Sequence, residues 1–128
     1  MDSFEKKIKL LRQLKEKLIV FLDELIELLP NHSQDLVNLR IHFLDSIPME
    51  TVMDIMIERM LPNKSMIEQR KDVFFLEQND IFSGLSDDGV SYFRTIWTSK
   101  ELDDDDKAAI WDWFIFFLKL TEAYKKLG

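Results

Sequence analysis

Apolar residues recur every three or four positions over residues 4–29, and this spacing indicates one amphipathic α-helix of about seven turns. The members of this stripe are Phe4, Ile8, Leu11, Leu18, Leu22, Leu25 and Leu29. From Leu18 onward, in "LIVFLDELIELL", only Asp23, Glu24 and Glu27 are polar. We therefore expect the second half of the helix to pack against two neighbours and its first two turns to project beyond them.

Prolines at positions 30, 48 and 62 divide the following sequence into helix-length pieces, because proline ends a helix or opens one. The pieces predict helices within 30–47, 48–62 and 63–78. Asn31 or Ser33 is the expected N-cap of the first, and Ser65 with Glu68 forms an expected capping box for the last. No segment shows the period-2 alternation of a strand.

The second half of the chain adds a loop rich in Asn, Asp, Ser and Gly, a short helix ending near Trp97, and a long final helix. The expected fold is all-α: residues 1–128 form a single-domain bundle of five to seven helices, with a long N-terminal helix and a long aromatic-rich C-terminal helix. The expected core residues are Leu22, Leu25, Phe43, Ile55, Phe74, Phe93, Trp97, Trp111 and Phe114.

The final helix begins with four aspartates, in "LDDDDKAAIWDWFIFFLKL". Helix N-termini favour negative charge, so Asp103 is the expected N-cap and the tract needs no metal. The apolar run from Ala108 to Leu120 contains Asp112 and Lys119 and is too short to span a membrane. Its aromatics cover more than one face, which predicts either a buried helix or a contact with a partner or a second copy. The candidate interface residues are Trp113, Phe116, Phe117 and Leu120.

The sequence contains no cysteine, and His32 and His42 are its only histidines. No nucleophile motif, zinc motif or glycine-rich phosphate loop is present. We therefore expect no enzymatic activity, no metal, no cofactor and no small-molecule substrate. The absence of cysteine and of an apolar leader favours the cytoplasm over secretion.

The formal net charge is −7, which disfavours general phosphate binding, but the first helix is basic. Lys6, Lys9, Arg12 and Lys17 are the candidate nucleic-acid contacts if the protein is an accessory factor in replication or transcription. Glu5 and Glu16 lie at helical spacing from these cations, so a solvated, internally paired face is the alternative.

Three stretches together carry a resemblance: "LPNHSQDLVNLRIHFLDSIP", "MLPNKSMIEQRKDVFFLE" and "LDDDDKAAIWDWFIFFLKLTEAYKKL". Their order and wording resemble small all-helical proteins of the nucleocytoplasmic large DNA viruses, the giant viruses of algae and amoebae. The resemblance implies a viral protein in the host cytoplasm, at the viral factory, or in the virion. It carries no functional residues, and with the aromatic helix it favours a virion or assembly component that binds other proteins.

A second resemblance is to apoptosis regulators of the Bcl-2 class, which some viruses carry. "FSGLSDDGVSYFRTIW" before "IWDWFIFFLKL" is similar to their paired helix motifs. The central arginine of that motif normally follows Asn, Trp and Gly, whereas Arg94 follows Ser91, Tyr92 and Phe93. A host-modulating function is therefore the lower alternative.

Overall fold

The computed structural model describes residues 3–76 and 97–128. Its helices are α1 (Ser3–Leu28), α2 (Ser33–Ile41), α3 (Met49–Met60), α4 (Lys64–Glu68), α5 (Val73–Leu76) and α7 (Asp104–Lys126). Two 3-10 turns, η1 (Pro30–His32) and η3 (Leu61–Asn63), and one π-helical turn, η2 (His42–Ser46), join them. No strand occurs in these two ranges, which confirms the all-α class. The expected number of five to seven helices stays a prediction, because residues 77–96 lie outside the described part.

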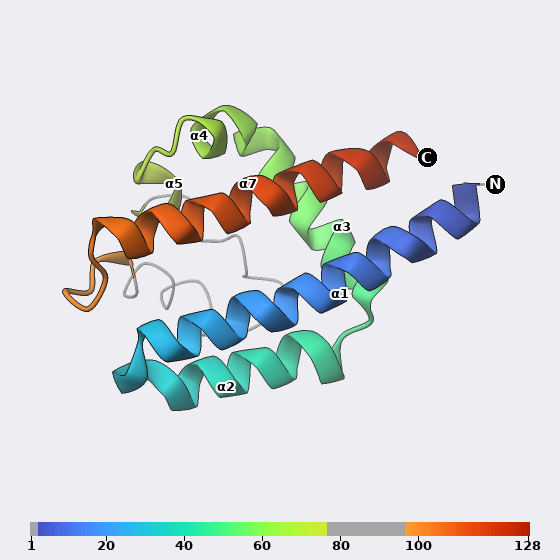
Figure 1. The fold of residues 1–128 in the computed structure, drawn as a ribbon. Helices are drawn as coiled ribbons and strands as arrows, with labels where there is room; N and C mark the ends of the chain where they lie inside the picture. Colours follow the sequence, from blue (N-terminus) through green and yellow to red (C-terminus); the bar gives the residue numbers. More distant parts are fainter. Residues whose placement is uncertain (1–2, 77–96) are drawn as a thin grey trace.

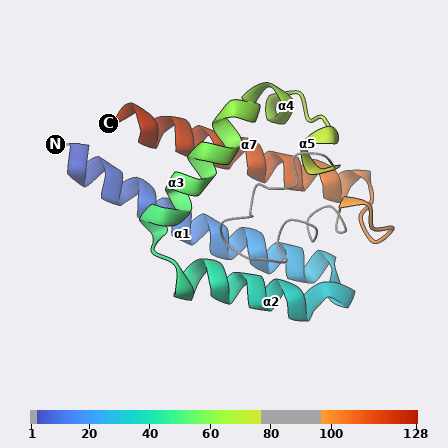
Figure 2. The same cartoon turned by 180° about the vertical axis from the view of Figure 1, so that it is seen from behind.

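Helix α1 lies between α2 and α7, and α3 crosses behind α1 and α7 (Figures 1 and 2). The chain runs in opposite directions along α1 and α7, so that its two termini meet at one end (Figure 1). The buried positions of α1 are Leu14, Leu18, Phe21, Leu22 and Leu25. Phe4 is 70% exposed, so the first turn of the stripe extends beyond the neighbouring helices as expected.

Aromatic rings form the contact between α7 and the rest of the chain. Phe21 of α1 lies 5.9 Å from Phe114 and 5.6 Å from Phe117, both in edge-to-face geometry. On the other side of Phe114, the ring of Phe74 in α5 lies 6.0 Å away, also edge-on. Such edge-to-face pairs contribute about 0.5–1.5 kcal/mol each beyond the area they bury. The cluster therefore ties α1 and α5 to one helix that is distant from both in sequence.

Most of the expected core is confirmed. The buried members are Leu22, Leu25, Phe74, Trp97, Trp111 and Phe114. Ile55 is only partly buried and packs against the edge of this core. Phe93 and the side chain of Phe43 lie outside the described part of the structure, so their expected burial stays a prediction.

The single helix expected within 63–78 is wrong, because the chain turns between α4 and α5. Arg70 has φ 54°, in the left-handed region that ends an α-helix. Its amide donates to the Ile67 carbonyl at 3.1 Å, and the Lys71 amide donates to the Met66 carbonyl at 3.0 Å. This pair of hydrogen bonds is the Schellman arrangement, normally completed by glycine.

The guanidinium group of Arg70 anchors this turn to α7. It donates to the Ala108 carbonyl at 3.3 Å and forms an ion pair with Asp112, both on α7. A second ion pair joins Lys64 of α4 to Glu122 of α7 at 2.9 Å. The α4 region is thus held to α7 by polar contacts that sequence periodicity does not reveal.

Two expected caps are also wrong. No side-chain cap bond is formed at the start of α4, and the hydroxyl of Ser65 instead accepts a hydrogen bond from Gln69 at 2.9 Å. Helix α2 likewise begins after a 3-10 turn with His32 at the N-cap position and no side-chain cap. Asn31 is directed elsewhere, to Glu101.

Phe117→Ala tests the aromatic contact. Because the side chain is 1% exposed, its truncation should lower the free energy of unfolding by about 3–5 kcal/mol. Urea unfolding followed by circular dichroism measures the change. Lys119→Ala, at an exposed position of the same helix, is the matched control and should change it by less than about 0.5 kcal/mol. Equal stabilities of the two variants would contradict the buried position of Phe117.

Candidate interaction surfaces

The four interface residues expected on α7 divide into two pairs. Phe117 and Leu120 are buried within the chain, 1% and 5% exposed, so they present no open surface to a partner. Trp113 and Phe116 are only partly buried. The expectation for Phe117 and Leu120 is corrected because α7 packs against α1, α3 and α4, which cover more than one of its faces. We refer to Trp113 and Phe116 as the α7 edge.

The ring of Trp113 is fixed in place from two sides. It stacks on Phe117 at 5.8 Å with 23° between the planes, and it lies 5.8 Å from Phe21. Its indole nitrogen donates to the Glu24 carboxylate on α1 at 2.7 Å. Phe116 approaches it edge-on at 6.2 Å. The α7 edge therefore holds two aromatic side chains in fixed orientations while part of their surface remains open.

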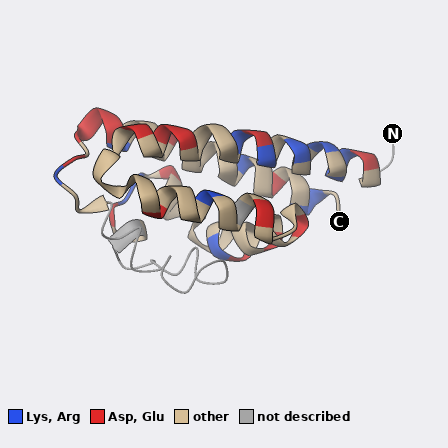
Figure 3. Cartoon of the chain, turned by 90° about the horizontal axis from the view of Figure 1, so that it is seen from below, with Lys and Arg blue, Asp and Glu red and all other residues tan. Residues whose placement is uncertain are grey.

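The cations expected to contact nucleic acid do not form one narrow row. Lys6, Lys9 and Arg12 are exposed on α1, whereas Lys17 is partly buried. At 100° per residue, Lys6 and Lys17 lie on one side of the helix and Arg12 on the other. Lys and Arg occur along the N-terminal half of α1, and Asp and Glu along its other half (Figure 3).

The last turn of α7 brings further lysines to the end of the molecule where α1 begins. Lys125 and Lys126 are exposed in that turn, and the two termini lie close together (Figure 1). Lys7 of α1 lies over the ring of Tyr124, 5.5 Å from its centre. Burial raises the pKa of the Tyr124 phenol above its ordinary value, and the charges of Glu50 and Asp54 raise it further. This end therefore carries clustered lysines together with nearby acids of α3.

The aspartate tract is a helix start, as expected. Asp103 is the N-cap, and its carboxylate accepts a hydrogen bond from the Asp106 amide at 2.8 Å. The Asp106 carboxylate accepts in return from the Asp103 amide at 3.3 Å, which completes a capping box. The box that sequence reasoning assigned to α4 is therefore found at α7.

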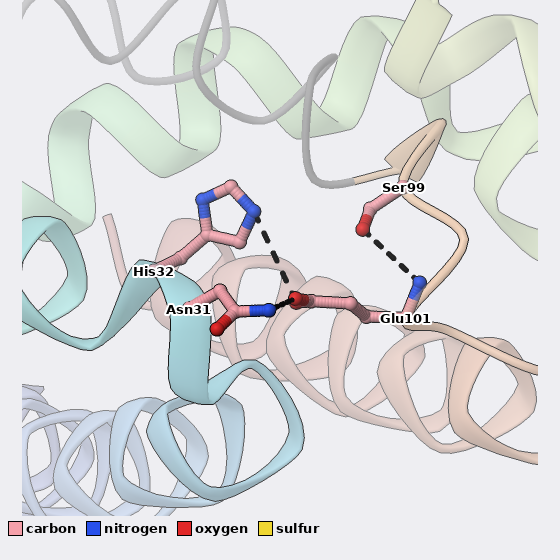
Figure 4. A network of polar contacts seen from close by, with 4 residues as sticks. All are labelled: Asn31, His32, Ser99 and Glu101. Atoms are coloured by element: carbon pink, nitrogen blue, oxygen red, sulfur yellow. Dashed lines mark hydrogen bonds and ion pairs between the residues drawn. The ribbon is translucent and has the colours of Figure 1, made fainter.

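A polar cluster joins the corner between α1 and α2 to the loop before α7 (Figure 4). Asn31 donates to one carboxylate oxygen of Glu101, and Nε2 of His32 lies 3.9 Å from the other. The Glu101 amide donates to the hydroxyl of Ser99 at 3.1 Å. No sequence signal links positions 31 and 101, because only folding brings them together. The cluster holds the acidic end of α7 against η1, and we assign it a structural role.

Sequence reasoning also missed an exposed aliphatic surface on α1 and α2. Val20 is 43% exposed on α1, and Val37 and Ile41 of α2 are 37% and 47% exposed. The same two helices are joined by an ion pair between Asp23 and Arg40, whose oxygen and nitrogen atoms lie 3.1 Å apart. Val20 lies one turn before Asp23 on α1, and Val37 and Ile41 lie within one turn of Arg40 on α2.

Three further findings bear on the expected functions. Among residues 3–76 and 97–128, no three His, Asp or Glu side chains gather as a metal site would require. In the same ranges no helix combines the length and hydrophobicity needed to cross a membrane. Arg94, which carried the Bcl-2 resemblance, lies outside the described residues.

No protein-family model, curated protein or solved structure matches this chain.

Asp103→Ala tests the cap of α7. Loss of the side-chain acceptor should lower the free energy of unfolding by about 1 kcal/mol, since the Asp106 amide loses its partner. Asp105→Ala removes the same charge from the first turn of α7 but leaves the cap in place. It should lower the free energy of unfolding by only about 0.3 kcal/mol. Thermal unfolding of both variants at one pH measures the difference. Equal losses would mean that charge, rather than the hydrogen bond, is what the helix start requires.

Proposed function

We propose that the protein acts by binding other proteins, catalyses no reaction, and is a virion or assembly component of a nucleocytoplasmic large DNA virus. The proposed form is one helical bundle over residues 1–128, with five to seven helices, located at the viral factory in the host cytoplasm or in the particle. The observation that supports a binding function is the α7 edge, where Trp113 and Phe116 remain partly open.

Trp113 has the properties of an aromatic anchor at a protein interface. Tryptophan is enriched among residues that dominate binding, because it offers a large, rigid contact area and loses little entropy on binding. The hydrogen bond to Glu24 and the stack on Phe117 already fix the Trp113 ring before any partner arrives. Binding of a partner would therefore cost little side-chain entropy at Trp113.

The first test is recovery of the protein with purified particles after expression in infected cells. Trp113→Ala combined with Phe116→Ala should reduce recovery at least about tenfold, because each lost anchor costs about 2 kcal/mol or more of binding. Phe116→Ser alone is a second variant that leaves the Trp113 stack intact. Lys119→Ala with Lys125→Ala, also on α7, should leave recovery unchanged, and melting curves exclude unfolding as the cause.

Two results would contradict this proposal. One is absence of the wild-type protein from particles together with no retained protein partner. The other is equal recovery of the α7-edge variant and the control.

The second candidate is a nucleic-acid-associated accessory factor. The observation that favours it is that the fold brings Lys125 and Lys126 to the same end as Lys6 and Lys9 (Figure 1). Phosphate contacts from several cations would supply sequence-independent affinity. The acids of α3 near Tyr124 act against it, since they lower the positive potential of this end.

Salt dependence tests the second candidate. If Lys6, Lys9, Arg12 and Lys17 neutralise about four phosphates, affinity for duplex DNA should fall about 100-fold between 50 and 200 mM salt. Fluorescence anisotropy of labelled single- and double-stranded DNA measures it. Lys6→Glu with Lys17→Glu should weaken binding, whereas Lys119→Glu with Lys107→Glu serves as the control of equal charge. Absence of binding at 50 mM salt would leave the protein-binding function.

A further inference from the structure

Three exposed aliphatic side chains of the described residues lie on the neighbouring helices α1 and α2. The exposed large hydrophobic residues within 3–76 and 97–128 are Phe4, Val20, Val37 and Ile41. All but Phe4 lie within one turn of Asp23 or Arg40, the two residues of the ion pair that joins α1 to α2. Val20 lies one turn before Asp23, and Val37 lies one turn before Arg40, so that both valines border the pair. Charged and aliphatic side chains thus lie close together in sequence on these two helices, and the three aliphatic ones are exposed in the described part of the structure.

The outward side of α1 continues this surface along the helix. Exposed residues recur there every three or four positions: Lys9, Arg12, Glu16, Val20, Asp23 and Glu27. At 100° per residue they share one side of the helix, opposite the buried stripe that contains Leu18 and Leu25. We call this set the outer stripe of α1. It spans about 27 Å, from a basic half near the N-terminus to an acidic half.

The order of charges makes the outer stripe complementary to itself when it is reversed. We propose that it is the contact of a symmetric dimer, in which the α1 helices of two copies of this chain lie antiparallel. With the two-fold axis midway along the stripe, Lys9 of each copy lies opposite Glu27 of the other, and Arg12 lies opposite Asp23. The Asp23 side chain is 56% exposed, so its carboxylate can accept from Arg12 of the second copy while it stays paired with Arg40 of its own chain. Because a two-fold contact uses the same patch on both subunits, each of these pairs forms twice.

The exposed aliphatic residues lie at positions where the second copy would cover them. Val20 lies near the two-fold axis, opposite Glu16 of the second copy, whose methylene groups can cover it. Val37 and Ile41 flank the acidic half, where the hydrocarbon stems of the second copy's Lys9 and Arg12 would pass on the way to their carboxylates. Charge pairs therefore set the direction and register of the contact, and the aliphatic side chains supply the area removed from water.

A second copy fits this face better than a nucleic acid or an unrelated acidic protein. A polyanion would be repelled by the acidic half, and an acidic protein would be satisfied by the basic half alone. Only a surface with the reversed charge order engages both halves, and this chain itself carries one. The outer stripe borders the α7 edge, because Val20 lies one turn before Glu24, which accepts the hydrogen bond from Trp113. The charge-reversed variants described below change no residue of the α7 edge, so separate substitutions test the dimer and the proposed protein binding.

The test uses charge reversal in two complementary variants of the full chain. Lys9→Glu with Arg12→Glu makes the whole stripe acidic, and Asp23→Lys with Glu27→Lys makes its acidic half basic. Each variant alone places like charges opposite each other and should sediment as a monomer. An equimolar mixture should restore the dimer, because every pair across the mixed contact is then opposite in sign.

Sedimentation velocity between about 20 and 500 µM protein measures the outcome, since a contact at the small end of interface sizes is expected to be weak. The wild-type dimer should weaken at least about tenfold in affinity between 50 and 500 mM salt, because the paired charges are exposed. Lys119→Glu with Lys125→Glu, exposed on α7, gives the same change in net charge and should leave the dimer unchanged. Circular dichroism confirms that each variant is folded.

Val20→Asp is an independent variant that leaves every charge pair in place. It should abolish the dimer, whereas Phe4→Asp, at the exposed start of α1, should not. A wild-type protein that is monomeric at every concentration would overturn the proposal. So would a dimer that survives both charge-reversed variants, or a mixture that stays monomeric. If the dimer is absent while particle recovery still depends on Trp113, the protein-binding function stands without it.

Discussion

The contact between Phe21 and the aromatic face of α7 is the interaction on which the other helices depend. Phe21 meets Phe114 and Phe117 edge-on and also approaches Trp113, so one residue of α1 contacts about one full turn of α7. Phe74 then packs on the far side of Phe114 and brings α5 to the same helix. Burial of these rings stabilises the contact of α1 and α5 with α7, and the polar contacts of Arg70 and Lys64 join the α4 region to the same helix.

This packing also decides which surfaces remain for function. Phe117 and Leu120 are buried in the core, whereas Trp113 and Phe116 lie at the edge of the core and are only partly buried. The outer stripe of α1 stays exposed in the described part of the structure, and α2 borders it through the ion pair between Arg40 and Asp23. The proposed protein contact and the proposed dimer contact therefore both use residues that packing of the core leaves exposed or only partly buried.

Sequence patterns predicted the elements whose stability is local. The stripe of α1 and the acidic cap of α7 follow from spacing and from the helix dipole, and both are confirmed. The break at Arg70 escaped prediction, because a left-handed turn is ordinarily marked by glycine and here an arginine occupies it. The predicted Ser65 cap was also wrong. The Ser65 hydroxyl accepts a hydrogen bond from Gln69 instead, and neither periodicity nor composition shows which local partner a hydroxyl will take.

By itself, the sequence determined that this chain is helical, where its two long helices run, and that the final helix has more aromatic surface than one face can bury. It could not decide which of those aromatics are covered, since that depends on how many helices surround α7. Only the tertiary structure placed α1, α3 and α4 around it, buried Phe117, and left Trp113 bonded to Glu24 at the border. The physical reason is that periodicity reports the faces of a single helix, whereas burial is a property of several helices that meet in space.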